Sequence, residues 1–122
     1  QISKEIETAS YFKFYELHNY LYKGKEIWNE AHKECRNLEK SLLLEKIDHF
    51  NGSGTVCVAN NGYGIFSFLF AMVHPNLRIV ATEQDPEKVA IAQHCTGLPS
   101  NISIYVTSEL PEDLLFDYII TL

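Results

Sequence analysis

The residues whose types and spacing best suit chemistry are two glycines and one acid in the second half of the chain. Gly62 and Gly64 flank Tyr63, and Glu83 follows Gly62 by 83 − 62 = 21 residues. Glycine lets the backbone approach a ligand closely and take φ > 0. An acid about 20 residues after such a loop can accept hydrogen bonds from both hydroxyls of a ribose. The spacing therefore predicts a site for a cofactor that carries a nucleoside.

Parallel strands are the framework that would bring these residues together. After the breaker Asn51-Gly52-Ser53-Gly54, short β-branched runs alternate with helix patterns. Strands joined by helices run parallel with right-handed crossovers. The sequence thus predicts an α/β fold, a Rossmann-like partial parallel sheet ordered 3-2-1-4 with helices before it. The expected strands are 55–59, 78–83, 103–107 and 116–122, with helices over 65–73 and from Asp85-Pro86 onward.

The first 50 residues show helical spacing and no strand pattern. Five apolar residues share one helical face, namely Ile27, Ala31, Cys35, Leu38 and Leu42. We therefore predict an N-terminal helical segment over 1–50 that packs on the core. We predict a Rossmann-like half-domain over 51–122 that is truncated at Leu122.

Composition and charge narrow the class of protein. The chain has 122 residues, which suits one domain, and its net charge of −6 disfavours nucleic acid as a partner. Three cysteines without a CxxC pair indicate a reducing compartment, so we expect a cytoplasmic protein. The longest apolar run, IFSFLFAMV, is too short to cross a bilayer, and no metal-ligand pattern surrounds the histidines.

The loop pattern bears on which cofactor would bind. A dinucleotide site has G-x-G-x-x-G, and Ser67 stands at its third glycine position. The remaining pattern resembles the class I S-adenosylmethionine-dependent methyltransferases, in which a glycine-rich loop follows the first strand, an acid ends the second strand, and F-D-x-I-x opens the fourth strand. Here that last run is Phe116-Asp117-Tyr118-Ile119-Ile120. The resemblance implies an S-adenosylmethionine site made by Asn60, Gly62, Tyr63, Gly64, Glu83 and Ser108.

Three further runs narrow the resemblance. YLYKG, QDPEKVAIAQHC and NISIYV look like the methyltransferase-type domain that follows a lysophospholipid acyltransferase domain in some bacterial multidomain proteins. This implies a fragment of a larger lipid-modifying protein, held at the cytoplasmic face of the membrane by upstream domains. The chain has no H-x-x-x-x-D box, so the acyltransferase chemistry would lie in those upstream domains.

Two departures from the family pattern leave alternatives open. The family's acid falls at Val58, which cannot accept a hydrogen bond, and its first loop glycine falls at Asn60. We therefore expect weak cofactor binding or none, and no catalytic base can be assigned. A non-catalytic scaffold or interaction domain of the same fold is the second hypothesis, and a dinucleotide-binding oxidoreductase fragment is the third.

The last strand predicts an association. The run FDYIITL would leave one long apolar edge unpaired, and bare edges of this kind associate. We expect either that further residues cover this edge or that two copies pair through residues 116–122. We expect Asp117, which opens the strand, to be a structural cap.

Overall fold

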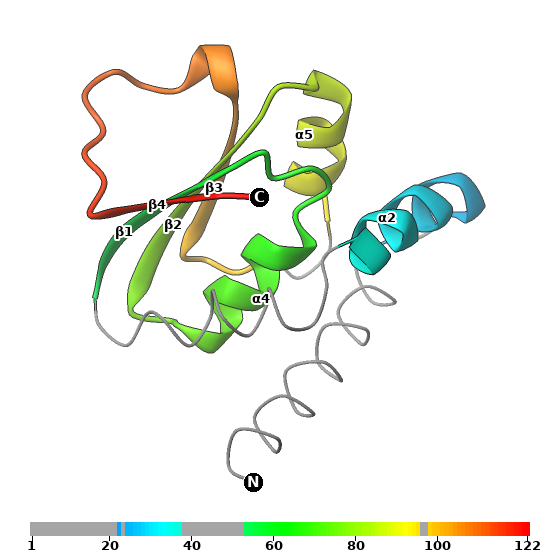
Figure 1. Ribbon diagram of the computed structural model, residues 1–122, viewed down its shortest axis with the longest axis horizontal. Helices are drawn as coiled ribbons and strands as arrows, with labels where there is room; N and C mark the ends of the chain where they lie inside the picture. The colour runs from blue at the N-terminus through cyan, green and yellow to red at the C-terminus, as the bar shows by residue number, and fades with distance from the viewer. Residues whose placement is uncertain (1–21, 23, 38–52, 96–97) are drawn as a thin grey trace, which may run out of the picture.

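A parallel sheet and the helices beside it make up the computed structural model, which describes residues 22, 24–37, 53–95 and 98–122 (Figure 1). The order of elements is α2 (Lys25–Asn37), β1 (Gly54–Ala59), α4 (Ile65–Val73), β2 (Leu77–Glu83), α5 (Pro86–Gln93), β3 (Ile102–Val106), the short 3-10 helix η1 (Thr107–Glu109) and β4 (Tyr118–Thr121). None of the helices in these described ranges is long and apolar enough to span a membrane.

The sheet has four strands in the order β3-β2-β1-β4, and every neighbouring pair is parallel. The predicted fold class and strand order are therefore confirmed. Since β1, β2 and β3 succeed one another in one direction, right-handed crossovers place α4 and α5 on the same face of the sheet. Both helices pack against β2 and β3.

The core lies between α4 and this face of the sheet. All residues of α4 from Ile65 to Ala71 are buried, and all of them except Ser67 are apolar, as expected for a helix covered on every side. In β1, Val56 and Val58 are fully buried in the same cluster. Val58 pairs with Ala81 of β2, which in turn pairs with Ile104 of β3. The continuous apolar strands of the sequence are thus explained by burial in a parallel sheet.

The start of α5 follows the predicted capping pattern. Asp85 is the N-cap, its Oδ1 accepts a hydrogen bond from the amide of Glu87 at 3.0 Å, and Pro86 occupies the first turn. The helix ends at Gln93, and Gly97, the predicted terminator, lies outside the described residues.

The final strand is shorter than predicted. It runs from Tyr118 to Thr121 because Asp117 is used as a cap, with its Oδ2 accepting a hydrogen bond from the amide of Thr55 at 2.8 Å. This contact joins the start of β4 to the start of β1 and confirms the structural role expected for Asp117.

The N-terminal predictions are tested only over part of their length. Helix α2 covers the predicted face from Ile27 to Cys35, and its Ala31 is fully buried. Leu38 and Leu42 lie outside the described residues. The division of the chain into 1–50 and 51–122 stays a prediction.

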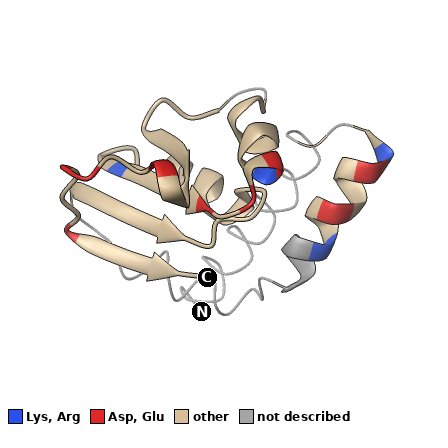
Figure 2. Ribbon diagram, turned by 90° about the horizontal axis from the view of Figure 1, so that it is seen from above, with Lys and Arg blue, Asp and Glu red and all other residues tan. Residues whose placement is uncertain are grey.

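Charge is unevenly distributed along the chain. After Lys88 the sequence has no Lys or Arg, but it has four acids, Glu109, Glu112, Asp113 and Asp117. Figure 2 shows acidic residues on the connection from β3 to β4 and along α2. The end of the chain therefore carries a negative potential.

Candidate functional site

The loop between β1 and α4 has an unusual backbone. Asn60, Gly62 and Gly64 all have positive φ, at 59°, 63° and 94°. Two backbone hydrogen bonds fix the turn, from the Asn61 amide to Thr82 O and from the Gly64 amide to Asn61 O, each at 3.0 Å. The alternation of left-handed residues makes a tight loop at the carboxyl end of β1, which we call the 60–64 loop.

Glu83 binds this loop directly. Its Oε1 accepts the Gly62 amide at 2.9 Å, and its Oε2 accepts the Asp85 amide at 2.8 Å. The structure thus brings Gly62 and Glu83 together as the spacing predicts. An ionised carboxylate has about four acceptor positions. Two further donors, such as the two hydroxyls of a ribose, can therefore bind the same carboxylate.

The predicted site residues differ in accessibility. Asn60 and Ser108 are exposed, Tyr63 and Glu83 are half-buried, and Gly62 and Gly64 are buried. The side most open to a ligand is therefore formed by Asn60, Tyr63 and Glu83. Ser108 lies in η1 just after β3, two residues beyond Val106, the pairing partner of Glu83. Within the described residues Ser108 makes no hydrogen bond to the 60–64 loop.

Gly64 has a packing role that the sequence did not show. A Cβ there would lie 3.0 Å from Phe68 Cζ and 3.2 Å from Asn61 Nδ2. Asn61 is itself buried, and its Oδ1 accepts a hydrogen bond from Ser67 Oγ at 2.5 Å. The glycine therefore makes room for an internal polar contact at the start of α4, in addition to adopting a left-handed φ.

Two residues beyond the predicted set also reach the loop. The hydroxyl of Tyr22 donates to the carbonyl oxygen of Tyr63, which lies 41 residues later in the sequence. Lys88 Nζ of α5 lies 5.4 Å from the centre of the Tyr63 ring. Neither contact could be predicted from the periodicity of the sequence, since each joins residues of two separate elements. The run YLYKG, which carries Tyr22, contributed only to the family resemblance.

Burial makes the described thiols poor nucleophiles. It raises the pKa of Cys57, although a hydrogen bond with Thr82 acts in the opposite direction. It raises the pKa of Cys95 to about 11. The thiolate is the reactive form, so neither group is suited to covalent catalysis at neutral pH.

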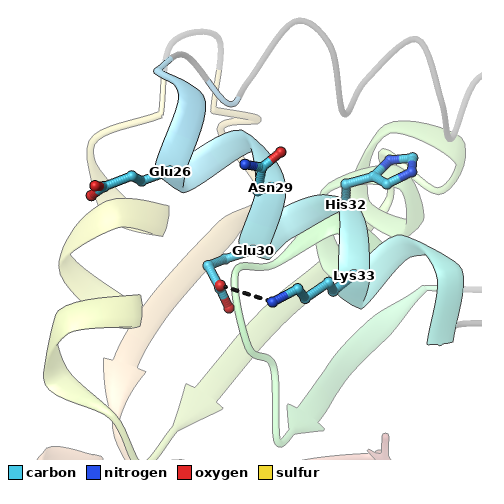
Figure 3. A pocket seen from close by; sticks show the side chains of 5 residues that line it. All are labelled: Glu26, Asn29, Glu30, His32 and Lys33. Atoms are coloured by element: carbon cyan, nitrogen blue, oxygen red, sulfur yellow. Dashed lines mark hydrogen bonds and ion pairs between the residues drawn. The ribbon is translucent and has the colours of Figure 1, made fainter.

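A separate hollow lies along α2. Its described lining residues are Glu26, Asn29, Glu30, His32 and Lys33, all from that one helix (Figure 3). Lys33 Nζ lies 3.2 Å from Glu30 Oε1, and both side chains are largely exposed, so this ion pair contributes little to stability. The hollow shares no lining residue with the carboxyl ends of the strands. Among the residues in the described ranges, no three metal-ligating side chains cluster.

The four parallel strands in the order β3-β2-β1-β4, with helices between them, define a Rossmann-like α/β fold. Among solved structures, the chain is similar to coclaurine N-methyltransferase bound to N-methylheliamine and SAH, with a TM-score of 0.53 and 12% sequence identity. The match covers 67% of this chain and 26% of that one, so this chain spans about a quarter of its neighbour's length. At this identity the likeness shows the fold alone. No protein-family model matches the sequence, and the comparison with curated proteins gave no match.

Proposed function

We propose that this chain is a methyltransferase-like domain that binds S-adenosylmethionine weakly. The contact between the Gly62 amide and the Glu83 carboxylate, at 2.9 Å, is the observation that carries the proposal. It lies where β1 has β2 on one side and β4 on the other. In open α/β sheets, ligands bind at such a switch point, outside the carboxyl ends of the strands.

Four of the six predicted site residues have a chemically suitable role toward that cofactor. Glu83 would accept the ribose hydroxyls, and Ser108 would face the adenine amino group. The backbone amide of Asn60 and the Tyr63 ring would border the amino-acid end. The cofactor, when bound, supplies an electrophilic methyl group on sulfur. This chain would bind and orient it, and no described side chain is assigned as the base for a methyl acceptor.

We also propose that the chain is part of a larger cytoplasmic, lipid-modifying protein with an upstream acyltransferase domain. What supports this context is the sequence resemblance carried by YLYKG, QDPEKVAIAQHC and NISIYV. In that arrangement the upstream domains would hold the methyltransferase-like unit at the cytoplasmic face of the membrane.

A non-catalytic scaffold of the same fold is the second candidate, and two observations favour it. Val58, at the position of the family's acid, is fully buried and apolar. Gly62 and Gly64 are also buried, which limits direct contact with a ligand. A dinucleotide-binding oxidoreductase fragment is the least favoured candidate, because Ser67 occupies the third glycine position of G-x-G-x-x-G. Its hydroxyl donates a hydrogen bond to Asn61 Oδ1.

Calorimetric titration with S-adenosylhomocysteine tests the proposal, using the natural chain and Asn60→Gly. Glycine removes a side chain from the open face of the loop and suits the φ of 59°. We expect Asn60→Gly to bind about tenfold more tightly than the natural chain, a gain of about 1.4 kcal/mol. The matched control is Asn76→Gly, in the turn before β2. If neither the natural chain nor Asn60→Gly binds at millimolar ligand, the scaffold function replaces the cofactor function.

We propose that a second copy of this chain pairs along β4. Among the described strands, β4 is an edge strand next to β1, and three of its four residues are exposed. Ile119 is 68% exposed, and Leu115, just before the strand, is 87% exposed. Charged residues and prolines usually protect an edge strand from association, and β4 contains neither.

Sedimentation equilibrium tests this pairing. We expect the natural chain to dimerise at about 0.1 mM and Ile119→Lys to be monomeric, since a charge on an edge strand opposes association. Met72→Lys is the control, because Met72 is 53% exposed on α4, which packs against β2 and β3. A natural chain that stays monomeric, or a dimer that Ile119→Lys leaves intact, would contradict the proposal.

A further inference from the structure

Tyr63, at the centre of the 60–64 loop, is held by residues from outside that loop. Tyr22 donates its hydroxyl to the Tyr63 carbonyl oxygen. The two rings also meet edge to face, with centroids 6.1 Å apart and an interplanar angle of 79°. Tyr22 is 1% exposed, so both contacts are shielded from water. A buried tyrosine of this kind contributes through its ring area and through its hydroxyl.

The two glycines leave the middle of the loop dependent on contacts from outside it. Both neighbours of Tyr63 are glycines with positive φ, and glycine loses more conformational freedom on ordering than any other residue. An anchor on the Tyr63 carbonyl therefore restricts the peptide units that join Gly62 and Gly64. Since Glu83 fixes the Gly62 amide at 2.9 Å, the loop is held at two consecutive residues from two different parts of the chain.

A third contact extends the same cluster to α5. Lys88 Nζ lies 5.4 Å from the centre of the Tyr63 ring, a distance at which a cation and an aromatic face attract. Lys88 is in the first turn of α5, just after Asp85, whose amide binds Glu83. The position of Tyr63 thus depends on Tyr22 before α2 and on Lys88 in the first turn of α5.

Tyr22 stands close to the start of α2. Gly24, two residues after Tyr22, accepts the Trp28 amide at its carbonyl oxygen at 2.8 Å, and this hydrogen bond opens the helix. Helix α2 packs against α4, the helix that the 60–64 loop opens. The position of Tyr22 and the order of the loop are therefore parts of one contact network.

We propose that Tyr22 is a positioning residue that fixes the 60–64 loop and couples its own docking against Tyr63 to ligand binding at that loop. The coupling to a ligand rests on the function proposed above, whereas the fixing of the loop does not. By linkage, a ligand that binds the ordered loop also stabilises the docked Tyr22, and loss of the Tyr22 contact weakens ligand binding by the same factor.

Tyr22→Phe tests this inference, because it removes the hydroxyl and keeps the ring. Loss of one neutral hydrogen bond predicts about fivefold faster hydrogen exchange of the Gly64 amide. Exchange of the Val80 amide, in the centre of β2, should stay unchanged. The control is Tyr118→Phe, a tyrosine of β4 that should leave the Gly64 amide unaffected. Equal exchange in Tyr22→Phe and the natural chain, or a uniform increase over the whole sheet, overturns the positioning role.

Titration with S-adenosylhomocysteine separates this inference from the proposed function. We expect Tyr22→Phe to bind it about fivefold more weakly than the natural chain. If the natural chain binds and Tyr22→Phe binds equally or more tightly, the coupling is wrong and the cofactor function stands. If the natural chain does not bind but Gly64 exchange responds to Tyr22→Phe, the cofactor function is wrong and the positioning role stands.

Discussion

Replacing Gly54 by alanine should lower the free energy of unfolding by about 3 kcal/mol, measured by urea denaturation. Gly54 has a φ of 140°, which strains any residue with a side chain. A Cβ at this position would also lie 2.6 Å from Asp117 Oδ2, far inside van der Waals contact. Asp117 cannot simply move away, because the same oxygen accepts the Thr55 amide at 2.8 Å.

A second glycine gives a matched control for this prediction. Gly24 has a φ of 94°, and a Cβ there would meet nothing within 4 Å. Gly24→Ala should therefore cost only the backbone strain, about 1–2 kcal/mol. The difference between the two variants contains the overlap with Asp117 and the difference in strain between a φ of 94° and a φ of 140°. Equal losses would show that Asp117 is not what requires a glycine at position 54.

Replacing Glu83 by glutamine should destabilise the protein by about 2 kcal/mol and weaken S-adenosylhomocysteine binding at least tenfold. Both carboxylate oxygens accept backbone N–H groups, from Gly62 and Asp85. An amide of the same shape must turn its NH₂ group toward one of these donors. The Gly62 or the Asp85 amide then loses its hydrogen-bond acceptor, and the ribose of the proposed cofactor loses one as well. Thermal unfolding and calorimetric titration measure the two effects separately.

Glu87→Gln is the control for Glu83→Gln. Glu87 is an exposed acid in the first turn of α5, so its neutralisation should cost about 0.5 kcal/mol through the helix dipole. It should leave ligand affinity unchanged. A Glu83→Gln variant as stable as Glu87→Gln would show that the carboxylate does not hold the 60–64 loop.

The sheet could be predicted because its signals are local. Each strand is a short apolar run, the capping residues Asp85 and Pro86 mark the start of α5, and right-handed crossovers leave few possible strand orders. The spacing from Gly62 to Glu83 sets the acid on the neighbouring strand, so their proximity follows from the same topology.

The long-range contacts that complete the site and the sheet could not be predicted, because they join residues far apart in the sequence. Nothing near Tyr22 indicates that its hydroxyl binds the carbonyl of Tyr63. Nothing near Gly54 shows that Asp117 approaches it. The burial of Gly62 could not be predicted either, since the sequence of a glycine-rich loop is the same whether its backbone is exposed or buried. Side-chain packing determines these contacts and this burial, and the hydrophobic pattern of the sequence does not specify that packing.

The hydrogen bond between Asp117 and Thr55 spans 62 residues and has a consequence for folding during synthesis. β1 and β2 can pair as soon as both have left the ribosome, whereas β4 is the last of the four described strands to emerge and must dock beside β1. Closing so large a loop is entropically costly, so this step follows the others. Until then one flank of β1 has no neighbouring strand from 53–122, and a nascent chain at this stage is most exposed to misassembly.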